Sequence, residues 1–208
     1  MSHKLFHGIA TALTLALTLD AAGCGRATQT DATDISGVMP RLAFHLTRAS
    51  DGTRITAEDY RGKVVVLYFG YTHCPDECPT TLANLASALV RLGDGARNVR
   101  VAFVTVDPIR DTLPVLKSYV NAFSPEIDGL RGSDDAVATL ARRYRVIYSV
   151  TPGTPGHAYA VMHSDSVFFF DAKGNARLVT METGNTADIA ARIASLSRQD
   201  FAAKATVR

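Results

Sequence analysis

Two segments of the chain, 63–69 and 99–106, are almost continuously apolar and rich in β-branched residues. Runs of this length and composition are typical of strands that are buried on both faces. Segment 41–47 instead alternates apolar and polar residues, which predicts a half-buried strand. Turn residues at 50–52 then lead into a short return strand at 54–56. The pattern predicts an N-terminal hairpin followed by two buried strands.

Apolar residues at intervals of three and four predict helices in four segments: 80–92, 112–123, 134–144 and 186–196. Gly93 ends the first helix. The segments 166–170 and 176–181 flank turn residues and predict a second hairpin, and 151–156 is a loop rich in Pro and Gly. This order predicts a thioredoxin-like α/β sandwich, with a central mixed sheet flanked by helices and an N-terminal β-hairpin extension.

Composition indicates a globular domain and argues against a nucleic-acid-binding protein and a disulfide-rich scaffold. The chain has 208 residues, of which 47% are hydrophobic, and this suits one globular domain with an N-terminal extension. Its formal net charge is +2, and Lys and Arg form no basic stripe, so nucleic acid is not an expected partner. Three cysteines are too few for a disulfide-stapled scaffold.

The N-terminus has the features of an export signal. Residues 8–19 are apolar over a length typical of a secretory signal and too short for a comfortable membrane span. Small residues precede Cys24, as at a bacterial lipoprotein cleavage site, where this cysteine would be lipidated. Ordinary signal cleavage and an uncleaved anchor remain alternatives, and all three export the domain. We expect four parts: a lipoprotein-type signal peptide (1–23), a flexible tether (24–38), the thioredoxin-like domain (39–200) and a C-terminal tail (201–208).

Cys74 and Cys78 stand where the first buried strand gives way to a helix. Residues four apart on a helix are neighbours with Cα atoms about 6 Å apart, so the pair can form a disulfide or chelate one metal ion. A helix N-terminus favours the thiolate. Two sulfur ligands select copper(I) or zinc over hard cations. The pair predicts redox or soft-metal chemistry.

Four histidines are candidates for a third ligand: His45, His73, His157 and His163. His45 alternates outward on the first strand, and His157 lies in the Pro/Gly loop. His73 adjoins Cys74 and is expected to shape the loop or tune the thiolate. His163 precedes the strand of the second hairpin, which in a thioredoxin-like fold begins near the cysteine helix; capping that strand is the other explanation for it.

Several segments together resemble one known family. Residues 64–82, which include both cysteines, look like the signature of the Sco/SenC copper-chaperone family. Further segments are similar to the next blocks of that family in the same order: 106–112, 123–125 and 129–132. His163 falls where the family keeps its third ligand. The resemblance covers roughly residues 38–200.

The resemblance implies one copper ion per chain, as Cu(I) or Cu(II), bound by Cys74, Cys78 and His163. It implies delivery of copper to the dinuclear centre of cytochrome c oxidase subunit II, or reduction of the cysteines of that centre. It also implies a lipid-anchored protein at the periplasmic face of the inner membrane. A second periplasmic copper chaperone or a thiol reductase would be a further partner.

The chain departs from the family pattern beside the third ligand. Many members have an acidic residue where this chain has Met162, so Asp165 or Asp107 would have to orient the ring. Met162 itself is either a weak thioether ligand or, as we expect, a buried packing residue. Asp107 precedes Pro108 and could equally fix a turn. Asp107 and His73 are thus candidates for residues that contact the ligands rather than the metal.

Two other functions use the same cysteines. A metal-independent thiol-disulfide oxidoreductase of the cell envelope would need only Cys74 and Cys78, so we assign no enzymatic activity beyond thiol–disulfide exchange. A peroxidase is suggested only by Thr72 two residues before Cys74, a weak similarity.

Overall fold

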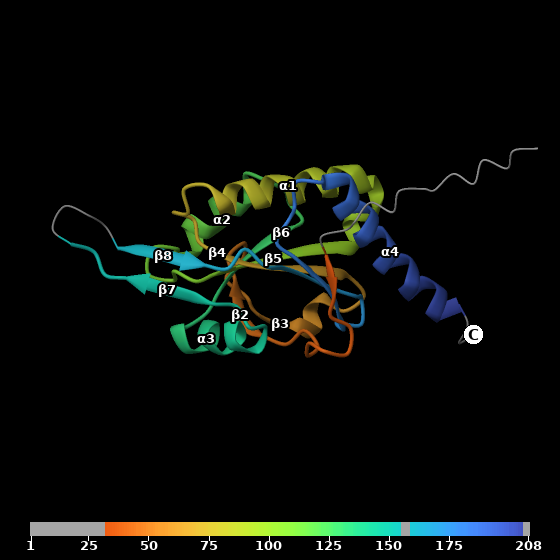
Figure 1. The fold of residues 1–208 in the computed structure, drawn as a ribbon, viewed down its shortest axis with the longest axis horizontal. Helices are drawn as coiled ribbons and strands as arrows, with labels where there is room; N and C mark the ends of the chain where they lie inside the picture. The colour runs from red at the N-terminus through yellow and green to blue at the C-terminus, as the bar shows by residue number, and fades with distance from the viewer. Residues whose placement is uncertain (1–31, 155–158, 206–208) are drawn as a thin grey trace, which may run out of the picture.

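The computed structural model describes residues 32–154 and 159–205. The signal-type segment 1–23, the lipidation candidate Cys24 and the candidate ligand His157 lie outside the described residues. The described residues form an α/β domain whose central sheet has helices on both faces (Figure 1). The predicted thioredoxin-like sandwich is therefore confirmed.

Eight strands form one mixed sheet, in the order β1 (Thr33–Asp34), β10 (Ala176–Thr180), β9 (Val167–Phe170), β4 (Val64–Gly70), β5 (Val99–Thr105), β6 (Ile127–Arg131), β2 (His45–Arg48) and β3 (Arg54–Thr56). The three central strands β4, β5 and β6 run parallel, and every other neighbouring pair is antiparallel. Two further strands, β7 (Tyr148–Thr151) and β8 (Ala160–His163), form a separate antiparallel ribbon that projects from one end of the domain (Figure 1). We call this ribbon the β7–β8 arm.

The helices lie on the two faces of the sheet. They are α1 (Glu77–Leu92), α2 (Leu113–Asn121), α3 (Asp134–Arg143) and α4 (Thr186–Ala205), with 3-10 turns η1 (Ala57–Tyr60) and η2 (Gly93–Asn98). Figure 1 shows α1 and α2 above the sheet and α3 below it, while α4 packs against α1. Parallel strands need such crossovers, because their connections must return along a face of the sheet.

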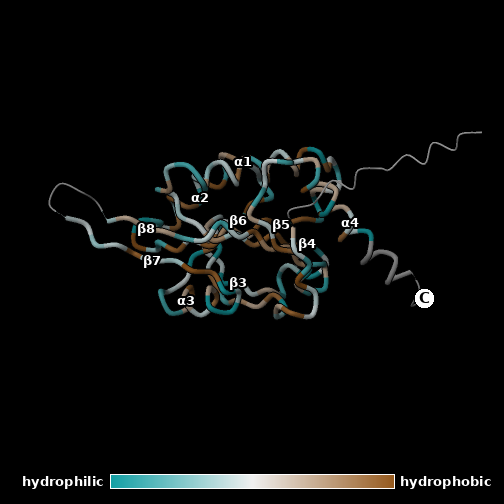
Figure 2. Tube along the Cα trace, in the orientation of Figure 1, coloured by the Kyte–Doolittle hydropathy of each residue, from teal (hydrophilic) through white to brown (hydrophobic). Residues whose placement is uncertain are grey.

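The core lies where the sequence predicts two-sided burial. All seven residues of β4 are buried, and so are six of the seven residues of β5. Figure 2 shows hydrophobic residues concentrated along these central strands, with hydrophilic stretches on the outer turns. Three further predictions are confirmed: the hairpin β2–β3, the helix after β4, and the end of that helix at Gly93, which has a φ of 54°.

Four strands were not predicted from the sequence: β1, β6, β7 and β8. β6 contains Asp128 and Gly129, so it lacks the apolar run that identifies β4 and β5. The β7–β8 arm is largely solvent-exposed, and its strands are only four residues long. His163 precedes β9 as expected, but it does not cap that strand, because it is the last residue of β8, a strand of its own.

Some predicted boundaries differ from the observed elements. β1 lies within the segment expected to be a tether (24–38), and it pairs with β10. At the other end, α4 continues to Ala205, past the expected end of the domain at residue 200. The ordered sheet and the last helix therefore both extend into segments that the sequence suggested were outside the domain.

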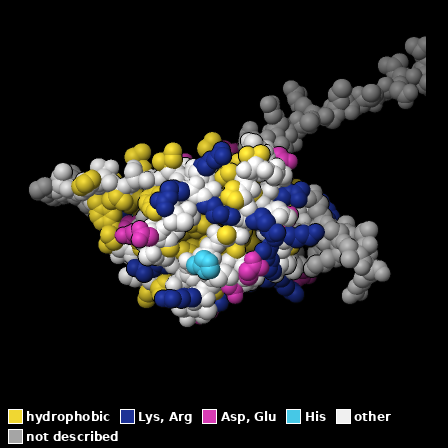
Figure 3. All heavy atoms as spheres, turned by 90° about the horizontal axis from the view of Figure 1, so that it is seen from below, with side chains coloured by type: hydrophobic (Ala, Val, Ile, Leu, Met, Phe, Trp, Pro, Cys, Tyr) yellow, Lys and Arg dark blue, Asp and Glu magenta, His cyan; other side chains and the backbone are white. Residues whose placement is uncertain are grey.

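The surface carries mixed charge. On the face in Figure 3, Lys and Arg side chains lie among acidic and hydrophobic ones, and hydrophobic side chains gather near the end that bears the β7–β8 arm. Exposed apolar residues of the arm and of the segment just before it include Ile147, Val150 and Met162. Within residues 32–154 and 159–205, no helix has the length and apolarity that crossing a membrane requires.

Candidate metal centre

The loop between β4 and α1 is held by one buried carboxylate. Asp111, which is fully buried, accepts hydrogen bonds from the Thr72 backbone N–H at 3.0 Å and the Thr72 hydroxyl at 2.6 Å. It also accepts a hydrogen bond from Thr105, the last residue of β5, at 2.6 Å. Because three donors converge on one carboxylate, the cysteine loop is fixed to the carboxyl end of the sheet.

The two cysteines lie on either side of the start of α1. Cys78 is the second residue of the helix, after the N-cap Asp76, whereas Cys74 lies in the preceding loop. The expectation that both thiols occupy the first helical turn is therefore wrong for Cys74. Its sulfur instead accepts a hydrogen bond from the Cys78 backbone N–H at 3.4 Å, which satisfies one of the unpaired donors of the first turn. Pro79 is the third helical residue, where a backbone donor is not needed.

His163 approaches the cysteines from the β7–β8 arm. Its Nε2 lies 3.1 Å from the sulfur of Cys78, and its Nδ1 lies 3.2 Å from the backbone carbonyl of Ser164. A proton on Nδ1 that is donated to this carbonyl leaves the Nε2 lone pair facing the sulfurs. The carboxylate of Asp165 lies 3.9 Å from Nδ1, beyond hydrogen-bond distance but on the side of the ring away from the sulfurs. Asp165 thus takes the position expected of a carboxylate behind the ring.

Sγ of Cys74, Sγ of Cys78 and a ring nitrogen of His163 all lie within 4.8 Å of one another. Bond lengths of about 2.0–2.3 Å, as in zinc sites, place the ligands of a shared ion about 3.5–4 Å apart. The observed separations therefore fit one metal ion after a small rearrangement, in which Nε2 of His163 and the Cys78 sulfur move apart from 3.1 Å. Two sulfurs and one imidazole nitrogen suit a soft or borderline ion.

Burial controls the chemistry of Cys78. This residue is fully buried, and burial raises the pKa of its thiol. The hydroxyl of Tyr68 lies 3.7 Å from the sulfur and donates to it, which acts in the opposite direction but does not prevail. In the metal-free site, burial therefore outweighs the preference for a Cys78 thiolate that is expected at a helix N-terminus. Metal coordination would supply the positive charge that a buried thiolate needs.

Aromatic rings surround the imidazole. Tyr71 and Tyr68 meet His163 nearly edge-on, with ring centroids 5.8 Å and 6.0 Å away. Neither tyrosine was identified from the sequence. The signal that could have found them is a polar aromatic residue inside or just after an otherwise aliphatic strand that leads to the cysteines.

The other predicted site residues stay outside the group of donor atoms. His73 hydrogen-bonds the Thr72 hydroxyl through Nδ1 at 3.0 Å and has a side chain that is 54% exposed, so it is a loop residue. Asp107 is buried in an ion pair with Arg110 and is not one of the three grouped donor residues. Met162 is 68% exposed, so the expectation of buried packing is wrong, because strand alternation turns it away from the face of His163.

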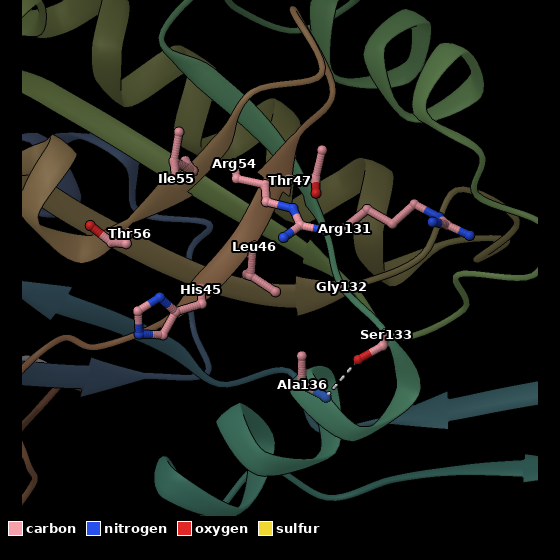
Figure 4. Close-up of a pocket in the computed structure, with 10 residues that line it drawn as sticks. All are labelled: His45, Leu46, Thr47, Arg54, Ile55, Thr56, Arg131, Gly132, Ser133 and Ala136. Atoms are coloured by element: carbon pink, nitrogen blue, oxygen red, sulfur yellow. Dashed lines mark hydrogen bonds between the residues drawn. The ribbon is translucent and has the colours of Figure 1, made fainter.

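His45 is exposed, as predicted, and lines an open pocket between β2, β3 and α3. Figure 4 shows the side chains of His45 and Arg131 pointing away from one another in this pocket. Arg131 already donates to the backbone carbonyl of Pro108 at 2.9 Å. The polar groups therefore do not converge on a shared position, and the pocket lacks the arrangement of a metal or ligand site.

A protein-family model described as SCO1/SenC matches residues 38–198. The chain belongs to the SCO1/SenC family. The bovine protein SCO2 homolog, mitochondrial, is 42% identical over 118 residues, which are 56% of this chain and 44% of the bovine protein. The chain thus spans about half the length of the curated relatives it matches.

Solved structures of the family superimpose on this chain. Arabidopsis thaliana ScoI with copper bound is 34% identical, with a TM-score of 0.69, and the match covers 76% of this chain and 98% of that one. Bradyrhizobium japonicum ScoI with copper bound is 32% identical, with a TM-score of 0.68, and the match covers 75% and 98%. The family membership and the fold predicted from the sequence are both confirmed.

Proposed function

We propose that this SCO1/SenC protein is a copper chaperone that binds one copper ion per chain through Cys74, Cys78 and His163. The observation that carries the proposal is the convergence of these three donor atoms within 4.8 Å, although 85 residues separate Cys78 from His163. Copper-bound structures of similar chains support copper as the ion. Two thiolates suit Cu(I), and the added imidazole suits Cu(II) as well.

The burial of the ligands suggests a route for copper transfer. Cys78 is fully buried, whereas Cys74 is only partly buried. An incoming ligand from a partner would therefore reach the ion from the Cys74 side, and Cys78 would release it last. Such stepwise exchange keeps the ion coordinated throughout, which suits a protein that delivers copper.

We further propose that the acceptor is the dinuclear copper centre of cytochrome c oxidase subunit II, as the family resemblance implies. The same cysteines could instead reduce a disulfide in that centre. In this reaction one thiolate attacks the partner disulfide and releases one partner thiolate, and the second then attacks the mixed disulfide and releases the other. Cys74 and Cys78 form their own disulfide, and their two electrons pass to the partner cysteines. A second periplasmic copper chaperone or a thiol reductase would then reload or reduce this protein.

The arrangement in the cell is part of the proposal. Residues 1–23 act as a lipoprotein-type signal peptide, Cys24 carries the lipid anchor, and the residues between Cys24 and β1 connect it to the domain. The domain then works at the periplasmic face of the inner membrane. The supporting pattern is the apolar segment followed by small residues before Cys24.

Anaerobic Cu(I) titration of the reduced protein tests copper binding, with a chromophoric chelator as competitor. We expect one tightly bound ion per chain, loss of tight binding in Cys78→Ser, and weaker binding in His163→Ala. His45→Ala is the matched control, because His45 is exposed on β2 and outside the donor group. A His163→Ala variant with unchanged copper affinity and unchanged Cu(II) spectra would remove His163 from the site.

A metal-independent thiol-disulfide oxidoreductase is the alternative, since Cys74 and Cys78 are both free thiols. This reading has no need for the imidazole that lies 3.1 Å from Cys78. Rapid turnover of a disulfide substrate that is insensitive to copper chelators and to His163→Ala would favour it over the chaperone.

A further inference from the structure

The β7–β8 arm carries His163, yet its two strands belong to a separate ribbon rather than to the main sheet. An isolated two-stranded ribbon is marginally stable, so its position depends on side-chain contacts with the domain. Apolar packing supplies part of this, because Val161 is buried. A cleft nevertheless lies between the arm and the domain, with Tyr148, Tyr159 and Val150 on one wall and Val106 and Pro108 on the other.

One arginine bridges this separation. The guanidinium carbon of Arg110 lies 3.9 Å from the ring centroid of Tyr159, which immediately precedes β8. The same carbon lies 5.5 Å from the ring centroid of Tyr71 in the cysteine loop. Both distances are within the range of cation–π attraction. Arg110 therefore contacts the arm and the cysteine loop at once.

A buried carboxylate holds the arginine in place. Asp107, which is 3% exposed, accepts a hydrogen bond from Arg110 Nε and another from the Tyr159 hydroxyl at 2.7 Å. Arg110 also donates from Nη1 to the Tyr159 backbone carbonyl at 3.4 Å. The ring, the hydroxyl and the carbonyl of Tyr159 are thus all bound to the Asp107–Arg110 pair at the end of β5.

The second contact of the arginine leads to the metal centre. Tyr71 meets the His163 ring at 88° with centroids 5.8 Å apart, and its carbonyl accepts the Cys74 backbone N–H at 3.3 Å. The ring that Arg110 contacts is therefore the ring that supports His163. The imidazole is bounded by Tyr71 on the loop side and by its own strand on the arm side.

We propose that Arg110 is a positioning residue that holds His163 over Cys74 and Cys78, by fastening Tyr159 of the arm against Tyr71 of the cysteine loop. This inference rests on the proposed copper binding at those three ligands. A planar guanidinium can stack on a ring and donate to a carboxylate simultaneously, and an ammonium group cannot do both. Arg110→Lys should therefore keep the charge and lose the positioning.

Copper affinity of Arg110→Lys is the first test, measured by anaerobic Cu(I) competition. Changes in residues that orient a metal ligand typically weaken metal binding by about 10–100-fold, and we expect about tenfold here. The matched control is Arg143→Lys, because Arg143 also lies over a tyrosine ring, that of Tyr144, at 5.9 Å, but donates to the backbone carbonyl of Arg41 and not to the arm or the cysteine loop. We expect wild-type affinity in the control.

A double variant separates positioning from a general structural effect. If Arg110 acts through His163, adding Arg110→Lys to His163→Ala should weaken copper binding no further. Tyr159→Leu removes the ring on the arm and leaves Asp107 and Arg110 in place. It should cause the same loss of copper affinity, and it serves as the test if Arg110→Lys folds poorly. Wild-type affinity in both single variants, or an equal loss in the His163→Ala background, would overturn the inference.

A metal-free readout distinguishes failure of this inference from failure of the proposed function. In the reduced protein without metal, the His163 ring resonances in NMR spectra should shift and broaden in Arg110→Lys and stay unchanged in Arg143→Lys. If wild-type protein does not bind copper but these resonances respond, the chaperone proposal fails and the positioning role stands. Unchanged resonances in Arg110→Lys refute the positioning role, whatever the copper affinity.

Discussion

Gly70, the last residue of β4, lies directly against one ligand of the metal centre. A Cβ atom added there would lie 2.6 Å from the sulfur of Cys78 and 2.6 Å from Cε2 of Phe103. Ordinary contacts begin at 3.4 Å, so the sulfur would have to move by about 0.8 Å. Gly70→Ala should therefore displace one copper ligand without changing its chemistry.

Two effects of Gly70→Ala can be given magnitudes. Overpacking at a buried site typically lowers the free energy of unfolding by about 1–3 kcal/mol, which is a fall in Tm of about 2–12 °C for a domain of this size. Metal–ligand bond lengths stay within about 0.2 Å of their usual values. A displacement several times larger should weaken copper binding by about tenfold or more, the scale of loss seen when ligand orientation is disturbed.

Thermal unfolding and Cu(I) competition on the same samples measure the two effects. Gly129→Ala in β6 is the matched control, since its added Cβ would lie 2.7 Å from Cγ of Leu116, a similar clash that does not involve a metal ligand. We expect comparable destabilisation in both variants and weaker copper binding only in Gly70→Ala. Equal copper affinity in the two variants would refute the argument that Gly70 sets the position of the Cys78 sulfur.

Two further predictions concern the buried tyrosines. Tyr68→Phe removes the hydroxyl that donates to Cys78, so the pKa of that thiol should rise further. Alkylation of Cys78 by iodoacetamide in the metal-free protein should therefore slow at pH 8–9, about the usual pKa of cysteine. An unchanged alkylation rate at Cys78 would show that this hydrogen bond does not affect the thiol. Burial and the neighbouring Asp128 raise the pKa of Tyr60 above its usual value of 10.0. The unfolded state therefore releases this proton first, so stability should be complete below about pH 10 and fall as the pH rises beyond it. Chemical denaturation between pH 8 and 11, with Tyr60→Phe as the comparison, checks this, and a flat profile in the wild type would contradict it.

Local patterns predicted the elements whose own residues carry the signal. β4 and β5 are apolar along their whole length, and α1 has apolar residues on one face and a glycine at its end. β6 was missed because Gly129 interrupts its apolar pattern. That glycine nevertheless suits the strand, since it leaves room for Leu116 of α2 to pack closely against the sheet.

The residues of the metal centre likewise fall into those that the sequence identified and those that it did not. Cys74 and Cys78 were recognised from their spacing, and His163 was assigned as a ligand through the family resemblance. Neither Arg110 nor Asp111 was assigned a place at the site from the sequence. In the structure Asp111 instead anchors Thr72, and Arg110 contacts Tyr159, 49 residues further along the chain.

By itself, the sequence determined which segments are buried, that two thiols lie at the junction of a strand and a helix, and which family the chain resembles. Only the tertiary structure decided that His163 lies 3.1 Å from Cys78, which ring nitrogen faces the sulfurs, and which side chains hold the arm in place. The physical reason is the distance along the chain between the residues that are in contact. Periodicity reports on contacts within about one helical turn or one strand, whereas the metal centre is assembled by strand pairing and side-chain packing between segments that are distant in the chain.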